Sequence, residues 1–198
     1  MKKYELTTDT KVVLGRKLFR IKALISFGNV TAGDFGGYVE KEENLSHDGN
    51  AWVYGNVEVS GNARVSGDAR VYGNAWVSGD ARVFGNAWVY GDAKVYGNAW
   101  VYGNARVSGD ARVYGNARVS GDARVFGNAD YICFKGLGSF NRNTTFFKCK
   151  DDHIHVSCGC FSGNLEEFEN KVKETHGNSK YAKEYLACVE VVKIHFEV

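Results

Sequence analysis

The chain has 198 residues and carries 25 basic against 23 acidic side chains, a formal net charge of +2, which excludes the strong positive charge of a duplex-binding protein. It has no apolar run of membrane-spanning length, no signal peptide and no lipidation motif, so we expect a cytoplasmic protein. Five cysteines, all in the last third of the chain, fit a reducing compartment better than a disulfide framework.

Residues 1–48 precede a regular repeat, and we expect them to cap it. Hydrophobic residues in the segment 11–27 flank Gly15-Arg16-Lys17, which predicts a β-hairpin or two short strands. The segment 28–48 is rich in Gly, Asn and Ser and predicts an irregular first coil. A cap is needed because a stacked repeat array leaves its terminal core surfaces bare.

From Gly49 to Gly127 the chain repeats the six-residue unit Gly-(Asn/Asp)-Ala-x-Val-(Tyr/Ser/Phe). A strict six-residue period predicts a solenoid shaped like a triangular prism, because each unit supplies one flat side and one corner, and three units close a coil. The Val and Ala side chains should point inward and stack between coils. Gly followed by Asn or Asp should form the corners, since these residues tolerate positive φ. We therefore expect a parallel β-helix over residues 49–130.

After the repeat, residues 131–198 predict a small α+β domain. Strands are expected at 131–135, 144–149 and 153–158, the last two joined by a hairpin turn at 150–152. Asn164 and Glu167 have the spacing of a capping box and predict a helix that ends at His176-Gly177. A second helix is expected over 179–190. The alternating tail from Val192 to Val198 predicts a final strand.

The repeat resembles the hexapeptide-repeat family, in which an aliphatic residue is followed four positions later by a small one. The resemblance covers Gly49 to about Ala129 and implies a left-handed parallel β-helix. Many proteins of that architecture are acyltransferases that use a histidine as general base, often beside a loop extruded from one coil. The repeat here contains neither histidine nor insertion, and His47 just before it is the nearest candidate. We therefore expect no catalytic residue and no cofactor, with acyl transfer as an alternative.

A cysteine and histidine cluster in the C-terminal domain is the second place where chemistry could occur. Cys149, His153, Cys158 and Cys160 are candidate zinc ligands, because thiolate and imidazole are ligands that zinc prefers. On a regular strand, however, Cys158 would share a face with Ile154 and Val156, and free cysteine packs as a small hydrophobe. The histidines His153 and His155 would then lie on the opposite face. We favour structural cysteines over a metal site or a Cys160–His176 nucleophile pair.

The outward positions of the repeat are its most informative surface. Taken every eighteenth residue, Trp and Arg alternate along each side, and Tyr forms parallel rows. Stacked Arg–Trp pairs and Tyr ladders stabilise adjacent strands, and the same composition is typical of protein interfaces. We favour a protein partner or a homo-oligomer, with single-stranded nucleic acid as the alternative. The expected contact residues are Trp52, Trp76, Trp88, Trp100, Tyr72, Tyr90, Tyr96, Tyr102, Arg70, Arg82 and Arg106.

Over its whole length the sequence is similar to phage and prophage solenoid proteins of Gram-positive bacteria. The stretches that carry this resemblance are residues 20–24, 32–40, 44–46, 48–53, the repeat units, 157–161 and 175–177. Small phage accessory proteins without an enzymatic motif often bind a host protein, including components of antiviral defence. The resemblance therefore implies a non-enzymatic inhibitor of a host factor.

Overall fold

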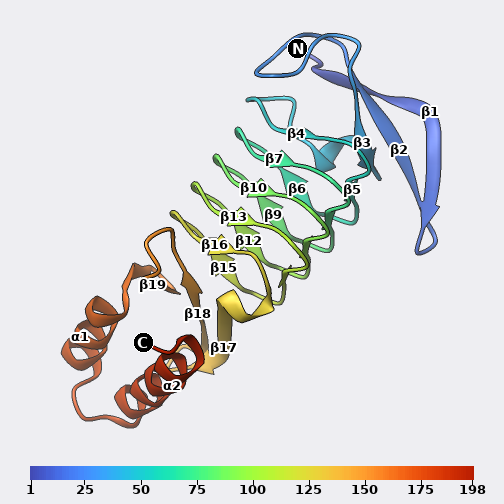
Figure 1. Cartoon of the computed structure of the whole chain (residues 1–198). Helices are drawn as coiled ribbons and strands as arrows, with labels where there is room; N and C mark the ends of the chain where they lie inside the picture. Colours follow the sequence, from blue (N-terminus) through green and yellow to red (C-terminus); the bar gives the residue numbers. More distant parts are fainter.

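The computed structural model describes residues 1–198 as an elongated molecule in which a β-solenoid separates two terminal units (Figure 1). Each coil advances the chain by 18 residues, as shown by hydrogen bonds such as that from Asn62 Nδ2 to Asp80 Oδ1. The solenoid strands pair in parallel and form three flat sides. The prediction of a mainly β protein built on a parallel solenoid is confirmed. None of the helices has the length and apolar character that a membrane span requires.

We name the three sides of the solenoid after their central tryptophans. The Trp88 side consists of β4 (Trp52–Val53), β7 (Arg70–Val71), β10 (Trp88–Val89), β13 (Arg106–Val107) and β16 (Arg124–Val125). The Trp76 side consists of β5 (Glu58–Val59), β8 (Trp76–Val77), β11 (Lys94–Val95) and β14 (Arg112–Val113). The Trp100 side consists of β6 (Arg64–Val65), β9 (Arg82–Val83), β12 (Trp100–Val101) and β15 (Arg118–Val119).

The repeat residues take the places that their size and backbone freedom allow. The Val and Ala residues of successive units, from Ala51 to Val125, are fully buried and form one continuous core. Corner glycines such as Gly73 have positive φ (72°), and a Cβ there would lie 3.0 Å from the carbonyl oxygen of Gly91 in the next coil. Only glycine fits a left-handed corner stacked this closely.

The N-terminal cap consists of β1 (Tyr4–Val13), β2 (Arg16–Ala23), β3 (Phe35–Val39) and the 3₁₀ helix η1 (Glu42–Asn44). β1 and β2 form the predicted hairpin, which extends the sheet of the Trp76 side beyond β3 (Figure 1). β3 pairs in parallel with β5, and Leu45 bridges to Val65. The predicted irregular first coil is therefore present within residues 28–48. Its backbone already pairs in parallel with the next coil, as the regular coils do.

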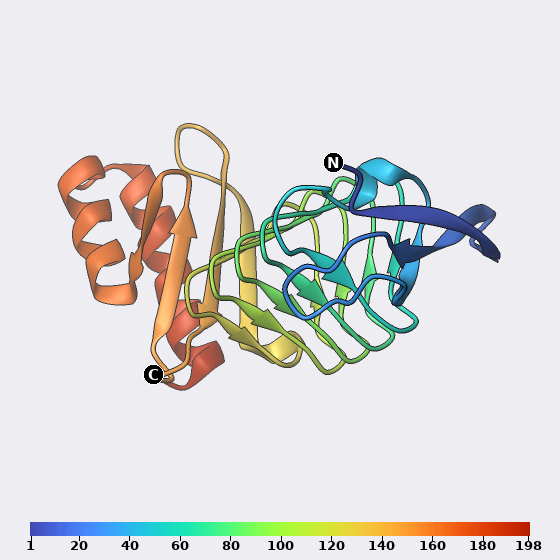
Figure 2. The ribbon, with the colours of Figure 1, turned by 90° about the horizontal axis from the view of Figure 1, so that it is seen from above.

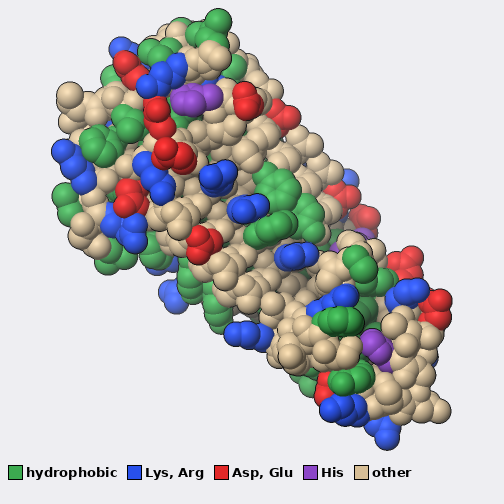
Figure 3. Space-filling model, turned by 180° about the vertical axis from the view of Figure 1, so that it is seen from behind, with side chains coloured by type: hydrophobic (Ala, Val, Ile, Leu, Met, Phe, Trp, Pro, Cys, Tyr) green, Lys and Arg blue, Asp and Glu red, His purple; other side chains and the backbone are tan.

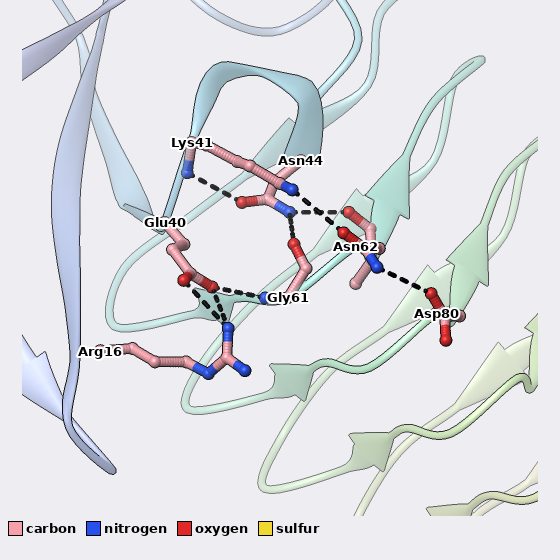
Figure 4. Close-up of polar contacts among 8 residues, drawn as sticks. Arg16, Glu40, Lys41, Asn44, Gly61, Asn62 and Asp80 are labelled. Atoms are coloured by element: carbon pink, nitrogen blue, oxygen red, sulfur yellow. Dashed lines mark hydrogen bonds and ion pairs between the residues drawn. The ribbon is translucent and has the colours of Figure 1, made fainter.

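Polar side chains join the cap to the regular coils. The Glu40 carboxylate accepts hydrogen bonds from Arg16 Nη1 at 2.8 Å and from the Gly61 amide at 2.6 Å. Asn44 is buried, and its Nδ2 donates to the carbonyl oxygens of Gly61 and Ala63 at 3.1 and 2.8 Å. Figure 4 shows both side chains directed from the cap toward the following coil. These bonds replace the pairing that a further coil would provide.

The C-terminal unit is a four-stranded antiparallel sheet with two helices. The strands are β17 (Tyr131–Leu137), β18 (Arg142–Lys148), β19 (Ile154–Cys158) and β20 (Phe161–Asn164), preceded by the 3₁₀ helix η2 (Asn128–Asp130). The helices are α1 (Leu165–His176) and α2 (Lys180–Phe196). One face of the sheet covers the end of the solenoid, where Phe147 and Cys149 join its core. The opposite face packs on the helices through Phe146, Val156 and Cys158, which gives the layered arrangement of Figure 2.

The sequence prediction for the C-terminal unit is correct for α1 and wrong for the chain end. Asn164 caps α1 with the predicted box, since its side chain and that of Glu167 each accept the other's amide hydrogen at 2.8 Å. The predicted final strand 192–198 is instead the last part of α2. Its Val and Ile alternation resembles a strand, but Val189, Val192 and Phe196 have helical spacing and form one buried stripe against the sheet. Strand β20 was not predicted.

Candidate interaction surface

Cationic and aromatic side chains interleave on the Trp88 side. The guanidinium carbons of Arg70 and Arg106 lie 5.7 and 4.9 Å from the centre of the Trp88 ring, one from each neighbouring coil. Tyr72 meets Trp88 edge-on at 6.1 Å and stacks on Tyr54 at 4.6 Å. The predicted alternation of Arg and Trp therefore forms an Arg–Trp–Arg stack, because residues one coil apart stand on adjacent parallel strands.

The Trp100 side carries a second stack of the same kind. Arg82 and Arg118 lie 5.1 and 4.9 Å from the Trp100 ring centre, again from the coils before and after. Phe84 meets Trp100 edge-on at 5.9 Å and stacks face to face with Tyr102 at 5.0 Å. Figure 3 shows one face of the molecule on which hydrophobic side chains gather over the middle of the solenoid between Lys and Arg side chains. Arg118 was not among the predicted contact residues, although it stands one coil after Trp100.

The Trp76 side is partly covered by the N-terminal hairpin. Trp76 stacks with Tyr96 at 6.3 Å, and Tyr96 stacks with Tyr114 at 5.3 Å. Near the N-terminal end of this side, Val13, Leu14 and Arg16 from the hairpin join Trp76 around a hollow of about 200 Å³. A large partner on this side would therefore meet the hairpin beside Trp76.

The structure corrects the prediction that all four tryptophans are exposed. Trp52 is only 1% exposed, because Phe27 and Tyr4 of the cap pack edge-on against it at 5.4 and 6.1 Å. Trp52 is thus a core residue of the cap junction and not a contact residue. The other expected tryptophans and tyrosines are half-buried under their own neighbours: Trp76, Trp88, Trp100, Tyr72, Tyr90, Tyr96 and Tyr102.

The cations of the flat sides have no carboxylate partners. The outward basic residues Arg64, Arg70, Arg82, Lys94, Arg106, Arg112, Arg118 and Arg124 form no salt bridge in the chain. Glu58, the one acidic residue among the outward positions of the solenoid strands, is paired with Lys11 at 2.8 Å. The solenoid's aspartates stand at the corners, where Asp68, Asp80 and Asp92 accept hydrogen bonds from asparagines of the preceding coil. The flat sides are therefore cationic and the corners acidic.

The two ends of the Trp100 side carry opposite charge. At the C-terminal end, Arg118, Arg142, Trp100 and Cys160 line a hollow of about 760 Å³ between the solenoid and the C-terminal unit. At the N-terminal end, Glu42, Glu43, Asp48, His47 and Arg64 line a hollow of about 480 Å³. A partner on this side consequently meets a basic aromatic centre that is bounded by acidic groups at one end only.

The candidate catalytic histidine is engaged in the cap. The His47 ring stacks on Tyr4 at 4.4 Å, and its Nδ1 accepts the amide hydrogen of Lys3 at 3.1 Å. The candidate nucleophile pair, Cys160 and His176, has no hydrogen bond between its two side chains. The His176 ring stacks on Tyr185 instead, with 5.6 Å between ring centres. Neither arrangement brings a nucleophile and a base together.

The predicted zinc ligands are separated by the C-terminal sheet. Cys158 faces the helices, where it is buried and accepts a hydrogen bond from Thr144 Oγ1 at 3.1 Å, as its predicted core role requires. Cys160 is exposed in the turn between β19 and β20. Cys149 and His153 do lie together, and their neighbour is His155 rather than either of these cysteines. The sequence did contain a signal for the cluster of Cys149, His153 and His155: His153 and His155 are two residues apart, which places them on the same face of a strand.

Comparison with known families agrees with the geometry of the repeat. A family model described as the YdcK beta solenoid repeat matches the chain at residues 57–73, 63–79, 75–91, 93–109, 99–115, 105–119 and 117–129. The chain is a β-solenoid repeat protein. All matched windows lie within the solenoid, so the similarity concerns the repeat and not the terminal units. No curated protein matches the sequence.

Proposed function

We propose that the chain is a non-enzymatic binding protein that presents the Trp100 side of its solenoid to an acidic surface of a protein partner. The observation that carries the proposal is the set of unpaired cations on this side: Arg64, Arg82 and Arg118 are exposed and have no carboxylate partner. Trp100 stands between two of them. Arginine beside a partly desolvated aromatic ring is the composition of interface hot spots.

The rigidity of the scaffold supports a binding role. Strand β12, which carries Trp100, pairs with β9 of the coil before and β15 of the coil after, and Trp100 is held by cation–π and edge-on contacts. Little conformational entropy is lost when side chains already held in place meet a partner. A preorganised flat surface of this kind favours recognition of another folded surface over capture of a small substrate, which needs a concave pocket.

We extend the proposal to a partner class from the resemblance to phage and prophage solenoid proteins. On this basis the partner is a host protein in the cytoplasm, and binding inhibits it. The alternative is an acyltransferase of the hexapeptide-repeat type. In that case His47 would have to act as the general base, although its Nδ1 already accepts the amide hydrogen of Lys3. Self-association is a further outcome, because the oppositely charged ends of the Trp100 side could pair between two antiparallel copies.

The experiment is a pull-down from a nuclease-treated lysate of a Gram-positive host, with wild-type protein and two charge-matched variants. Arg82→Glu/Arg118→Glu reverses two charges on the Trp100 side, and Arg112→Glu/Arg124→Glu reverses two charges on the other sides. We expect a stoichiometric host protein with the wild type and the second variant, and at least a tenfold lower yield with the first. Light scattering of the purified chain measures self-association in parallel.

Three outcomes would overturn the proposal. Capture that is equal for both variants would place the contact elsewhere, and capture that occurs from an untreated lysate but not from the nuclease-treated one would favour single-stranded nucleic acid. Transfer of an acyl group by the wild type that is lost in His47→Ala would establish the enzyme instead. Circular dichroism of each variant checks that the solenoid itself is intact.

A further inference from the structure

The hairpin turn between β18 and β19 brings three metal-binding side chains together. The ligand atoms of Cys149, His153 and His155 all lie within 4.8 Å of one another. Cys149 and His153 face each other across the turn, since the Cys149 amide donates to the His153 carbonyl oxygen at 3.0 Å. His155 follows two residues later on β19 and therefore points to the same face of the sheet. The backbone of a regular hairpin thus fixes the starting points of all three side chains.

We propose that Cys149, His153 and His155 form a binding site for a divalent zinc-class cation. One thiolate and two imidazoles form a ligand set that zinc prefers, with bond lengths of about 2.3 Å to sulfur and about 2.0–2.1 Å to nitrogen. Ligand atoms at such bond lengths stand about 3.2–3.7 Å apart in a tetrahedron. The cluster reaches this separation by side-chain rotation, because His153 is exposed and free to turn. The site is independent of the Trp100 side and goes beyond the proposed function.

A hydrogen bond on β20 orients one of the three ligands. His155 Nε2 lies 2.8 Å from Ser162 Oγ, and the ring stacks on Phe147 with 5.3 Å between centres. Since Nε2 is engaged with the serine, Nδ1 is the nitrogen left for the cation. Metal-binding histidines characteristically bond their other ring nitrogen to a neighbouring polar group, which holds the tautomer and the ring plane. Ser162 provides such a group.

The electrostatic surroundings also suit a cation. Burial, together with the negative charges of Asp122 and Asp151, raises the pKa of the Cys149 thiol to about 11. These carboxylates favour a positive charge beside the sulfur. Binding releases the Cys149 proton to solvent and forms the sulfur–metal bond.

The position of the site gives it a structural consequence. Cys149 is 4% exposed, belongs to the solenoid core, and forms a β-bridge with Ala123 of the last coil. A cation held by Cys149, His153 and His155 would tie the β18–β19 hairpin at the point where the C-terminal sheet rests on the solenoid. Because the folded chain holds the three ligands together and the unfolded chain does not, bound metal stabilises this junction.

Cobalt provides the test, because a tetrahedral Co²⁺ thiolate site absorbs visibly and in the near ultraviolet. Tag-free, full-length protein is titrated with CoCl₂ at neutral pH, and ZnCl₂ is then added in competition. We expect one Co²⁺ per chain, a thiolate-to-cobalt charge-transfer band, displacement by Zn²⁺ and a higher melting temperature with Zn²⁺. His153→Ala should weaken binding at least tenfold, and Ser162→Ala should weaken it about tenfold through the orienting bond.

Matched controls distinguish this site from the other cysteines and histidines. Cys160→Ser and His176→Ala change residues outside the cluster and should leave the titration unchanged. Cys149→Ala should abolish the charge-transfer band; His153→Ala tests the same site at an exposed position where folding is not at risk. The absence of a thiolate band in the wild type would overturn the proposal. So would an unchanged cobalt affinity in His153→Ala or the loss of the band in Cys160→Ser.

Discussion

At the scale of the residue, Glu40 joins three separate segments of the chain. Its carboxylate accepts hydrogen bonds from Arg16 of the hairpin and from the Gly61 amide at the corner of the following coil (Figure 4). The Gly61 hydrogen bond, followed by the Arg16 guanidinium, lowers the pKa of Glu40 below its usual 4.5, against the opposing effect of burial. The ionised form is therefore the form that stabilises the cap.

We expect Glu40→Gln to lower the free energy of unfolding by about 1–2 kcal/mol at pH 7, the range for losing charged hydrogen bonds at a partly exposed site. Because the folded-state pKa is depressed, the wild-type carboxylate stabilises the protein above the unfolded pKa, and this contribution is lost as pH falls through the folded pKa. The difference between wild type and variant should therefore shrink as the pH falls below the unfolded pKa and through the lower folded-state pKa. Urea unfolding over a series of pH values from 7 downward measures it; a difference that does not change with pH would contradict this account.

The contrast between Val71 and Trp52 explains how far single residues could be predicted. Val71 has its inward position dictated by its own repeat unit, and each neighbouring coil repeats the same constraint. Trp52 occupies an outward position of the same repeat, yet Phe27 covers it from a segment outside the periodic pattern. Periodicity reports on the environment that the repeat itself makes. It carries no information about what a non-repeating segment places on top of it.

The candidate site shows the same division. The face of β19 that carries Cys158 followed from the alternation of Ile154, Val156 and Cys158, and the structure confirms it. The grouping of Cys149 with His155 depends on the register of the β18–β19 hairpin, in which Lys148 pairs with Ile154. A turn of one more or one fewer residue would have shifted that register and separated the ligands. The predicted turn at 150–152 agrees with this register, but the candidate ligands were grouped by residue type, so the set combined residues from both faces of the sheet.

At the scale of the element, the end of α2 shows why the alternation of hydrophobic and polar residues over 192–198 wrongly predicted a strand. In a strand, Val192 and Ile194 would point to the same face. In a helix, two residues separated by two positions point in directions about 200° apart around the axis. The structure has Val192 fully buried and Ile194 79% exposed. The buried positions Tyr185, Val189, Val192 and Phe196 follow the helical stripe, and the exposed Val191 and Ile194 lie off it.

We expect Val192→Glu to destabilise the C-terminal unit by about 3 kcal/mol or more, because it buries a carboxylate without a partner. The matched variant Ile194→Glu should change stability by no more than about 0.5 kcal/mol, since the same charge then meets water. Thermal unfolding followed by circular dichroism compares the two. Equal losses would mean that the two side chains share a face, as the strand prediction required.

At the scale of the whole molecule, the core is continuous from the cap to the C-terminal sheet. One cluster of 35 buried residues runs from Tyr4 of β1 through every coil to Cys149 of the C-terminal unit. Within it, each coil contacts mainly the coil before and the coil after, as the pairing of strands one coil apart shows. Stability in such an array is close to a sum of nearly equal coil terms plus two cap terms. The number of coils should therefore be adjustable as long as the phase is kept.

Deletion of residues 67–84 removes β7, β8 and β9, one complete coil, and joins Ser66 to Gly85 in unbroken phase. The new neighbours are compatible: Glu58 would stand beside Lys94, Arg64 beside Trp100, and the inward Val and Ala rows stay continuous. We expect a folded, cooperative protein whose melting temperature falls by less than about 10 °C, since 1 kcal/mol corresponds to roughly 2–4 °C at this size. Deletion of 67–81 instead joins Ser66 to Arg82, which brings Val65 and Val83 out of phase, and that variant should not fold. Circular dichroism and gel filtration compare the two deletions; an unfolded first variant would mean that individual coils are not interchangeable and that the solenoid depends on interactions specific to the missing one.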